Sequence, residues 1–469
     1  MTLERKCQLN CRSQDSGSGV LTPSRTTELC RTTPVPLCPE EAKLKHYYST
    51  HCAQTGLPNL DLLLEHVEFT LRDSSSRHMV VLIINGVNEI GEHHGAAAGL
   101  HSLRTIAQRM RDIVGVHGYA ARLQGNLFAA VGNNVLPGQF AQQLMNVLQQ
   151  PIYWRGEPLQ LITAAGVVNN IDLVGSAESM LQAGYAAAKA ALTQNALGGI
   201  RQYTPELGNQ LERQYQISQR LRHAATSGAL SLAMQPKIDA ASGRIVGAEA
   251  LVRWQDDVLG SVSPGEFIPI AERTGSISSI TTWVLQQALQ EAASWHEQGL
   301  DLQVAVNLSA IDLRQPGLVA RIKSALEVCR CPPEKLIIEL TESAVAEDPV
   351  QAIAQLKALK NLGISLSLDD FGTGYSSLSY LRRFPIDTLK IDRSFVTDIP
   401  VDPDAVAIVQ SILALAKTMG MKTVAEGVET EAQAQFLRDA DVDVLQGYLF
   451  SKPVAKDKFI ELSEMKFII

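Results

Sequence analysis

The segment KLIIELTESAVAEDPVQAIAQLKALKNLGISLSLDDF, residues 335–371, decides the fold of the second half of this chain. Two short β-rich runs, residues 335–342 and 364–371, flank an amphipathic stretch that ends at Gly363. Glycine is favoured just past the end of a helix because it adopts a left-handed conformation without strain. The segment therefore predicts a strand–helix–strand unit with parallel strands.

The same unit recurs on both sides of this segment. Amphipathic stretches such as residues 280–298 and 403–420 separate short β-rich runs. The runs cover residues 230–235, 244–252, 302–309, 335–342, 364–371, 387–394, 421–428 and 443–450. Eight strands within about 240 residues predict an α/β fold with a C-terminal (β/α)8 barrel of the TIM type.

The first half has a less regular pattern. A strand over residues 78–86 precedes a helix over 98–115, a hairpin over 121–132, a strand over 159–169 and a helix over 176–192. Strands and helices that alternate irregularly around a hairpin predict an α+β sandwich. The expected domains are a disordered tail (1–44), the sandwich (45–205), a connector helix (206–222) and the barrel (223–469).

Composition narrows the function classes. The chain has 469 residues, a net charge of −8 and 5% aromatic residues, which argues against a nucleic-acid polymer or an anionic membrane as the main partner. The sequence has no apolar run near the length of a membrane span, and because its first residues lack an apolar stretch we expect no secretory leader. Its seven cysteines fit neither a zinc module nor a disulfide scaffold. We therefore expect a cytoplasmic protein with reduced thiols.

Polar side chains end seven successive predicted strands of the barrel, and most of them are acidic. They are Glu249, Asn307, Glu339, the pair Asp369 and Asp370, Lys390, Glu426 and Gln446. Because the active site of a TIM barrel lies at the carboxyl ends of its strands, we expect these groups to meet there.

Each acidic residue taken alone is better explained as a helix cap or a solvated loop residue. Several carboxylates at one barrel mouth, however, repel one another unless cations neutralise them. Their oxygens suit Mg²⁺ or Mn²⁺, and an adjacent pair such as Asp369 and Asp370 can bridge two metal ions. The residues alone therefore indicate a two-metal phosphohydrolase.

Seven ordered blocks resemble the signature of the EAL-domain cyclic-di-GMP phosphodiesterases. They are EALVRW at 249–254, VNLS at 306–309, ELTES at 339–343, DDFGTGYSSLSYL at 369–381, LKIDRSF at 389–395, VAEGVET at 424–430 and QGYLFSKP at 446–453. The resemblance covers about residues 220–460. It implies hydrolysis of cyclic-di-GMP to linear pGpG with two Mg²⁺ or Mn²⁺ ions per active site.

The resemblance also implies roles for single residues. The metal ligands would be Glu249, Asn307, Glu339, Asp369, Asp370 and Glu426. Lys390 would contact the attacking water, and Glu342 would steady the loop that begins DDFG; these two join Glu249, Asp369 and Asp370 as the catalytic set. The substrate contacts would be Gln235, Leu251, Arg253, Gln446 and Glu429. Met234, Lys237 and the pair Asp256-Asp257 are interpreted as peripheral departures from the family pattern.

The first half resembles a GGDEF diguanylate-cyclase domain over about residues 47–204. TGLPN at 55–59 and ARL at 121–123 match its pattern, but QGNLF at 124–128 replaces the signature. Ile83 and Asn85 stand where metal-binding aspartates are expected, and Gly115 and Gly118 replace an inhibitory Arg-x-x-Asp motif. Cyclase activity is not expected. Such a domain either only keeps the fold, or regulates by sensing GTP or another nucleotide or by dimerising.

Two other functions stay open beside the phosphodiesterase. One is a non-catalytic cyclic-di-GMP receptor or scaffold, which a missing metal ligand or a missing Lys390 would favour. The other is an unrelated metal-dependent barrel enzyme. The expected partners are cyclic-di-GMP and a second copy of the chain, because related barrels commonly form homodimers.

Overall fold

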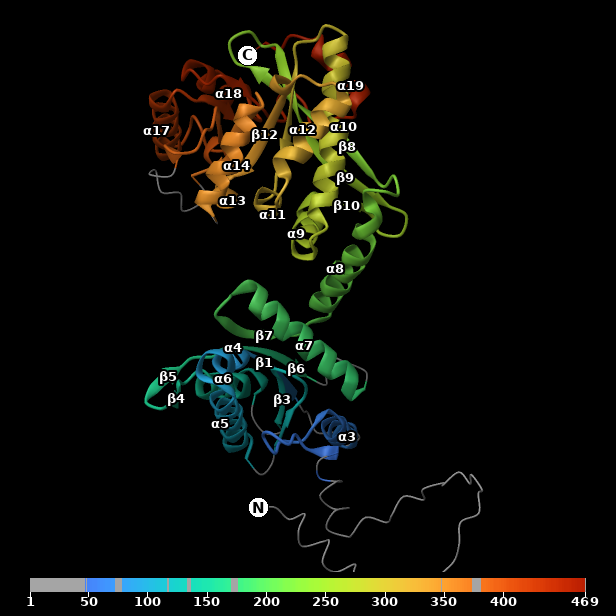
Figure 1. Cartoon of the computed structure of the whole chain (residues 1–469), viewed down its shortest axis with the longest axis vertical. Coiled ribbons are helices and arrows are strands. Elements are labelled where there is room, and N and C mark those ends of the chain that lie inside the picture. Colours follow the sequence, from blue (N-terminus) through green and yellow to red (C-terminus); the bar gives the residue numbers. More distant parts are fainter. Residues whose placement is uncertain are drawn as a thin grey trace, which may run out of the picture. The chain divides into compact units, whose positions relative to one another are not determined.

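The computed structural model describes residues 47, 49–71, 78–115, 118–132, 136–169, 176–346, 348–372 and 381–468 (Figure 1). It divides into two compact units, Met1–Tyr203 and Thr204–Ile469. The tail expected at residues 1–44 and residues 373–380 of the DDFG block lie outside the described residues. The tail and the expected domain limits stay predictions.

The first unit is built on a five-stranded sheet with the order β2-β3-β1-β6-β7. The central strand β1 is antiparallel to both β3 and β6, whereas β6 and β7 are parallel. The strands are β1 (His78–Asn85), β2 (Tyr119–Arg122), β3 (Leu127–Gly132), β6 (Ile162–Asn169) and β7 (Gly198–Gln202), and β4 (Ile152–Trp154) and β5 (Glu157–Leu159) form a separate hairpin.

Helices cover both faces of this sheet, which explains why β1 is apolar from Met79 to Ile84. Met79 and Val81 pack toward α3 (Leu60–Leu71) and α7 (Ala177–Gln194). Val80 and Leu82 point the other way, because side chains alternate along a strand, and pack toward the helices there. Those helices are α4 (Val87–His94), α5 (Ala96–Val114) and α6 (Pro137–Leu148). The predicted α+β sandwich is confirmed.

The second unit is a closed barrel of eight strands, and every predicted strand is present. The sheet closes because β8 pairs with both β9 and β16. The strands are β8 (Leu230–Asp239), β9 (Ile245–Asp256), β11 (Gln303–Asn307), β12 (Leu336–Thr341), β13 (Ser365–Phe371), β14 (Thr388–Ile391), β15 (Lys422–Ala425) and β16 (Val444–Leu445), with β10 (Gly260–Val262) paired to the end of β9. The TIM-type fold class is confirmed.

One strand departs from the regular (β/α)8 pattern. β8 runs antiparallel to both of its neighbours, whereas the other neighbouring strands of the barrel are parallel. A tight turn joins it directly to β9, with Gly243 at a positive φ of 69°. A Cβ at Gly243 would lie 2.1 Å from the carbonyl oxygen of Phe467, so only glycine fits this turn.

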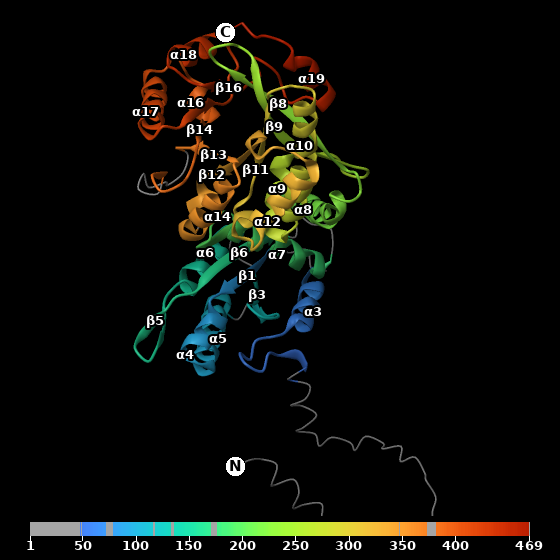
Figure 2. The same cartoon turned by 45° about the horizontal axis from the view of Figure 1, so that its top comes forward.

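Helices alternate with the remaining strands and cover the outside of the barrel (Figures 1 and 2). α14 and α17 are followed by Gly363 and Gly420, both at positive φ, as the sequence predicts. The helices are α9 (Pro264–Thr274), α10 (Ile277–Glu297), α11 (Ala310–Arg314), α12 (Leu318–Cys329), η3 (Pro333–Lys335), α13 (Glu342–Ala346), α14 (Pro349–Asn361), α16 (Arg393–Val396), α17 (Pro403–Met419), α18 (Glu431–Asp439) and α19 (Lys456–Ser463).

The helix expected as a connector is α8 (Pro205–Ala224), and it packs within the second unit. Its residues Ile217 and Leu221 are buried in the barrel's hydrophobic core. Arg220 Nε also donates a 2.6 Å hydrogen bond to Asp256 Oδ1. Burial alone would raise the pKa of Asp256, but the bonds from Arg220 and from two backbone amides hold it below its ordinary value. None of the described helices combines the length and apolarity needed to cross a membrane.

Candidate active site

The ammonium group of Lys390 lies among four carboxylates at the carboxyl ends of the barrel strands. Lys390, on β14, is 1% exposed. Its Nζ donates hydrogen bonds to Glu339 Oε2 at 2.8 Å and to Asp369 Oδ2 at 2.9 Å. The same atom lies 2.6 Å from Glu426 Oε1 and 4.0 Å from Glu249 Oε2. Four residues from the sequence-predicted set therefore meet around a fifth.

Strand register explains why residues far apart in the chain lie at one level. On the parallel strands Asn307 is paired with Glu339, and Thr341 with Asp369. Gln235 is paired with Glu249 even though β8 runs in the opposite direction. Because the side chains of a barrel alternate between interior and exterior, polar groups in register face the same interior layer.

Two amides hold the carboxylate of Glu249. Asn307 Nδ2 donates to Glu249 Oε1, and Gln446 Nε2 donates to Glu249 Oε2, both at 2.7 Å. Gln446 Nε2 also lies 3.3 Å from Gln235 Oε1. The structure thus brings two expected metal ligands and two expected substrate contacts into one hydrogen-bonded network.

The end of β13 positions the adjacent aspartates. Asp370 has a φ of 54°, which is uncommon for a residue other than glycine, and the register with β14 shifts between Leu368 and Phe371. Glu342 Oε2 accepts a 3.0 Å hydrogen bond from the backbone N–H of Gly372, at the start of the DDFG loop. The irregular backbone lies at the functional end of the strand, where such strain is commonly found.

A second buried lysine belongs to this cluster. Lys237 is 5% exposed, and its Nζ lies 2.5 Å from Glu339 Oε1. The two oxygens of Glu339 therefore each meet an ammonium group. The interpretation of Lys237 as a peripheral position was wrong. The sequence did carry a signal, because Lys237 stands two residues after Gln235 and so shares its face of the strand.

Negative charge is in excess at the barrel mouth, where five carboxyl groups face two ammonium groups. Burial raises the pKa of Asp369 and Glu426, and Lys390 offsets this only in part. Burial alone would raise the pKa of Glu339 as well, but Lys237 and Lys390 hold it well below its ordinary value. Conversely, the surrounding carboxylates raise the pKa of Lys390 against the effect of its burial.

The donor chemistry of the cluster fits hard divalent cations. Within the described part of the chain, no group of three or more His, Cys, Asp or Glu side chains is already spaced to hold a metal ion. Lys390 occupies the space among the carboxylates instead. The oxygens nonetheless carry uncompensated negative charge, and Glu426 Oε1 is buried without a well-aligned hydrogen-bond donor. Oxygen donors with excess negative charge are what Mg²⁺ and Mn²⁺ require.

Two cavities border the cluster and share one wall residue, Leu251. The smaller, of about 180 Å³, is lined by Gln235, Glu249, Leu251, Arg393, Glu426, Gly427, Glu429, Gln446, Gly447 and Tyr448. On its rim Glu429 Oε1 lies 2.8 Å from Arg393 Nη2. Four of the five expected substrate contacts therefore line one cavity, and none of these four is a ligand in the expected metal set.

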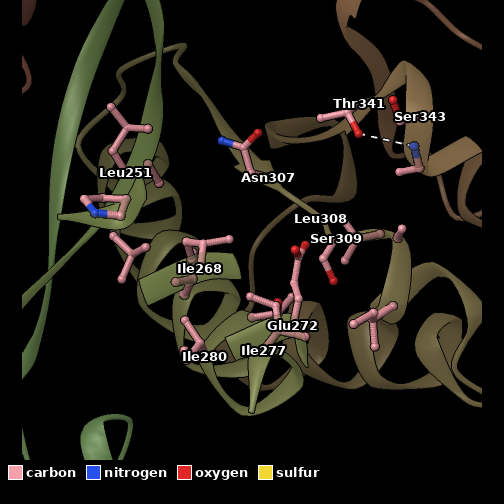
Figure 3. Close-up of a pocket in the computed structure, with 18 of the residues that line it drawn as sticks. Leu251, Ile268, Glu272, Ile277, Ile280, Asn307, Leu308, Ser309, Thr341 and Ser343 are labelled. Atoms are coloured by element: carbon pink, nitrogen blue, oxygen red, sulfur yellow. Dashed lines mark hydrogen bonds between the residues drawn. The ribbon is translucent and has the colours of Figure 1, made fainter. Parts of the chain in front are cut away.

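The larger cavity, of about 660 Å³, also reaches Arg253, the fifth expected substrate contact, and Asn307. In Figure 3 the side chains of Ile268 and Ile280 lie on the helices opposite Asn307. Glu272 is half-buried in this apolar wall, and burial together with the charge of Asp312 raises its pKa. Sequence reasoning missed Glu272, which lies on a helix and not at a strand end.

In the first unit, two amide side chains meet at the end of β1 and the turn before β3. Asn126 Nδ2 donates a 2.6 Å hydrogen bond to Asn85 Oδ1. Ile83 is buried, and its register partners on β3 and β6 are Leu127 and Ala164. The end of β1 and the turn before β3 are therefore joined by a hydrogen bond between two uncharged side chains, Asn85 and Asn126.

Comparisons with known proteins match the chain in the same two parts. The family model for the EAL domain matches residues 218–453, and the model for the diguanylate cyclase GGDEF domain matches residues 49–196. Bifunctional diguanylate cyclase/cyclic di-GMP phosphodiesterase MucR of Pseudomonas aeruginosa is 33% identical over 418 residues, which cover 87% of this chain and 61% of MucR. Cyclic di-GMP phosphodiesterase NbdA of the same organism is 35% identical over 411 residues, which cover 85% of this chain and 52% of NbdA.

Among solved structures, the PaMucR phosphodiesterase in complex with c-di-GMP is 43% identical with a TM-score of 0.50. The aligned region covers 52% of this chain and 99% of the PaMucR chain. The chain itself spans only about half to three fifths of the length of the two curated relatives.

Proposed function

The chain belongs to the EAL-domain family and carries a GGDEF domain ahead of its EAL domain, and on this premise we propose that it hydrolyses cyclic-di-GMP to linear pGpG. The observation that carries the proposal is the buried Lys390, held by Glu339 and Asp369 at the barrel mouth. The complex of the 43% identical PaMucR phosphodiesterase with c-di-GMP supports the choice of substrate.

The residues that would hold Mg²⁺ or Mn²⁺ are the four carboxylates around Lys390 together with two neighbouring residues, Asn307 and Asp370. They are Glu249, Asn307, Glu339, Asp369, Asp370 and Glu426. Divalent cations, when bound, supply Lewis-acid activation of water and neutralise charge on the phosphate. The bound cations would offset the negative charge of the mouth carboxylates and of the phosphates, so that an acidic protein could accept an anionic dinucleotide there.

The chain's own groups would act on the water and on the substrate. A water molecule attacks one phosphorus in line, the bond from phosphorus to the 3′ oxygen breaks, and that oxygen takes up a proton. Lys390, one residue before the end of β14, would orient the attacking water with its Nζ. Gln446 and Asn307 keep Glu249 in place through their hydrogen bonds.

Substrate recognition would use both cavities. Arg253, on the rim of the larger cavity, is placed to pair with a phosphate, and the apolar wall beside it gives room for a base. Gln235, Gln446 and Glu429 line the smaller cavity with polar groups. Leu251 separates the two and would contact the dinucleotide from either side.

The GGDEF unit would have no cyclase activity. Neutral amides at Asn85 and Asn126 cannot replace the carboxylates that hold a metal ion on the phosphates of GTP. This unit would keep its fold and act on the barrel, if at all, as a regulator.

Turnover assays on the purified chain test the proposal. With Mn²⁺ or Mg²⁺ present, cyclic-di-GMP should be converted to pGpG, and GTP should give no cyclic-di-GMP. Tight binding of cyclic-di-GMP without any pGpG would show a receptor instead of an enzyme. Neither binding nor turnover would point to a different metal-dependent barrel chemistry.

A further inference from the structure

Lys237 is a buried charge that the proposed mechanism does not use. It lies on β8, the antiparallel strand that closes the barrel, and reaches across the interior to Glu339 on β12. The two residues are 102 positions apart in the chain. Glu339 is 0% exposed and Lys237 is also buried, so both partners of this ion pair are shielded from water.

The two lysines that contact Glu339 differ in their surroundings. Lys390 is close to three further carboxylates besides Glu339, so its ammonium remains paired if a metal ion displaces it from Glu339 Oε2. For Lys237 the ion pair within the described structure is with Glu339 Oε1. Moving a buried ammonium away from its carboxylate is costly, so Lys237 should stay where it is when the site is loaded.

We propose that Lys237 is a positioning residue: it keeps one oxygen of Glu339 in an ion pair, so that this oxygen is not available to a metal ion, and thereby sets the metal affinity of the barrel mouth. With Oε1 held by Lys237, Glu339 can offer only Oε2 to a cation. The fixed positive charge also repels a divalent cation at that carboxylate, so Lys237 lowers metal affinity while it fixes the ligand in place. This inference rests on the proposed metal set, but not on the identity of the substrate.

Removing the charge separates this role from a merely structural one. Lys237→Met keeps an unbranched side chain of similar length without the ammonium. We expect the purified full chain to bind Mn²⁺ on the order of 10-fold more tightly by calorimetric titration, because one nearby positive charge is gone. Simple damage to the fold would change the affinity in the opposite direction.

Thermal unfolding gives a readout that needs no substrate. Without metal, Lys237→Met should melt below the wild-type protein because Glu339 Oε1 loses its donor in a buried site. Saturating Mn²⁺ should narrow that gap, since a ligand that binds the folded state more tightly stabilises it more. The rise in melting temperature caused by Mn²⁺ should therefore be larger in the variant.

A matched control and a double variant localise the effect. Lys335, 8% exposed, lies just before β12 at its amino end and pairs with Asp301, so Lys335→Met removes a buried ammonium far from the mouth. It should leave Mn²⁺ affinity unchanged. In a Glu339→Gln background, Lys237→Met should raise that affinity less than it does in the wild-type background, because releasing Oε1 no longer frees a carboxylate oxygen and only the repulsion by the ammonium is removed.

Each outcome decides the proposal. Unchanged or weaker Mn²⁺ binding by Lys237→Met, beside a wild type that binds normally, overturns the role of Lys237 alone. No Mn²⁺ binding by the wild type overturns the metal set and the proposed function with it. Should Lys237→Met fail to fold, Lys237→Gln, which keeps a donor without the charge, is measured in its place and must bind Mn²⁺ more tightly than wild type.

Discussion

Two strands, one from each half of this molecule, carry very different polar groups toward their carboxyl ends. In the first unit, β1 ends in Asn85, whose amide oxygen is satisfied by Asn126. In the second unit, β14 carries Lys390 among four carboxylates. β1 is buried from His78 to Ile84, and β14 is buried from Leu389 to Ile391. The fold is therefore maintained by strand interiors, while chemistry depends on a few polar groups at strand ends.

The sharpest test of this comparison is Lys390→Ala. Turnover of cyclic-di-GMP should fall by about 10²–10⁴-fold, because the group proposed to orient the attacking water is removed. The metal-free protein should also melt lower, since four buried carboxylates lose their common ammonium. Nucleotide turnover and thermal unfolding measure the two effects.

Lys422→Ala is the matched control for Lys390→Ala. Lys422 is exposed and begins the neighbouring strand β15 at the opposite end of the barrel, so both measurements should stay near wild type. Asp369→Ala should differ from both, with Mn²⁺ binding and turnover lost together. Near wild-type turnover in Lys390→Ala would contradict the role given to this residue.

The next test asks whether the second unit is independent. A fragment of residues 204–469 should unfold cooperatively and keep metal-dependent hydrolysis, because the barrel sheet is closed without the first unit. A fragment of residues 223–469 should be less stable by about 4 kcal/mol or more, because it lacks the core residues Ile217 and Leu221. Urea unfolding compares the two. If the longer fragment is insoluble or inactive, the two halves depend on each other.

A smaller effect is expected from the ion pair that fixes α8 to the barrel. The pKa of Asp256 lies below its ordinary value in the folded state, so the pair stabilises the protein above the unfolded pKa near 4 and is lost as pH falls through the folded pKa. Asp256→Asn should cost about 1 kcal/mol at pH 7 and progressively less below about pH 4. The free energy of unfolding of both proteins in urea, measured at pH 7 and below about pH 4, tests this expectation.

The more exposed pair on the same helix serves as the comparison. Arg213 and Glu266 are both about two-fifths exposed, so Glu266→Gln should change stability less than Asp256→Asn does. An equal loss for both variants, or a loss for Asp256→Asn that does not depend on pH, would show that the hydrogen bonds from Arg220 are not its source.

The smallest effect is expected in the first unit. Asn85→Ala should leave hydrolysis of cyclic-di-GMP within about twofold of wild type, because the strand end carries no catalytic group. Neither protein should form cyclic-di-GMP from GTP. A large change in hydrolysis would mean that this strand end regulates the barrel, and cyclic-di-GMP formation would contradict the contrast between the two halves.

Much of the candidate site could be predicted because its signal is local. An apolar run of strand length predicts a buried strand, and a polar residue at its end is visible in the sequence. Such residues are Glu249, Asn307, Glu339 and Lys390. A barrel fold then brings these ends together without further information. Ile83 and Asn85 lie in β1, a strand that the sequence predicts over residues 78–86; their interpretation as replacements of metal-binding aspartates stays a prediction.

What the sequence determined by itself was the order of the eight barrel strands and the polar residues at or near the ends of seven of them. The tertiary structure alone decided that β8 runs antiparallel, that α8 packs on the barrel, and that Lys237 pairs with Glu339. The physical reason is sequence separation. Helix and strand periodicity is set by neighbouring residues, whereas an ion pair across 102 positions exists only once strand register and barrel closure have fixed which side chains share the interior.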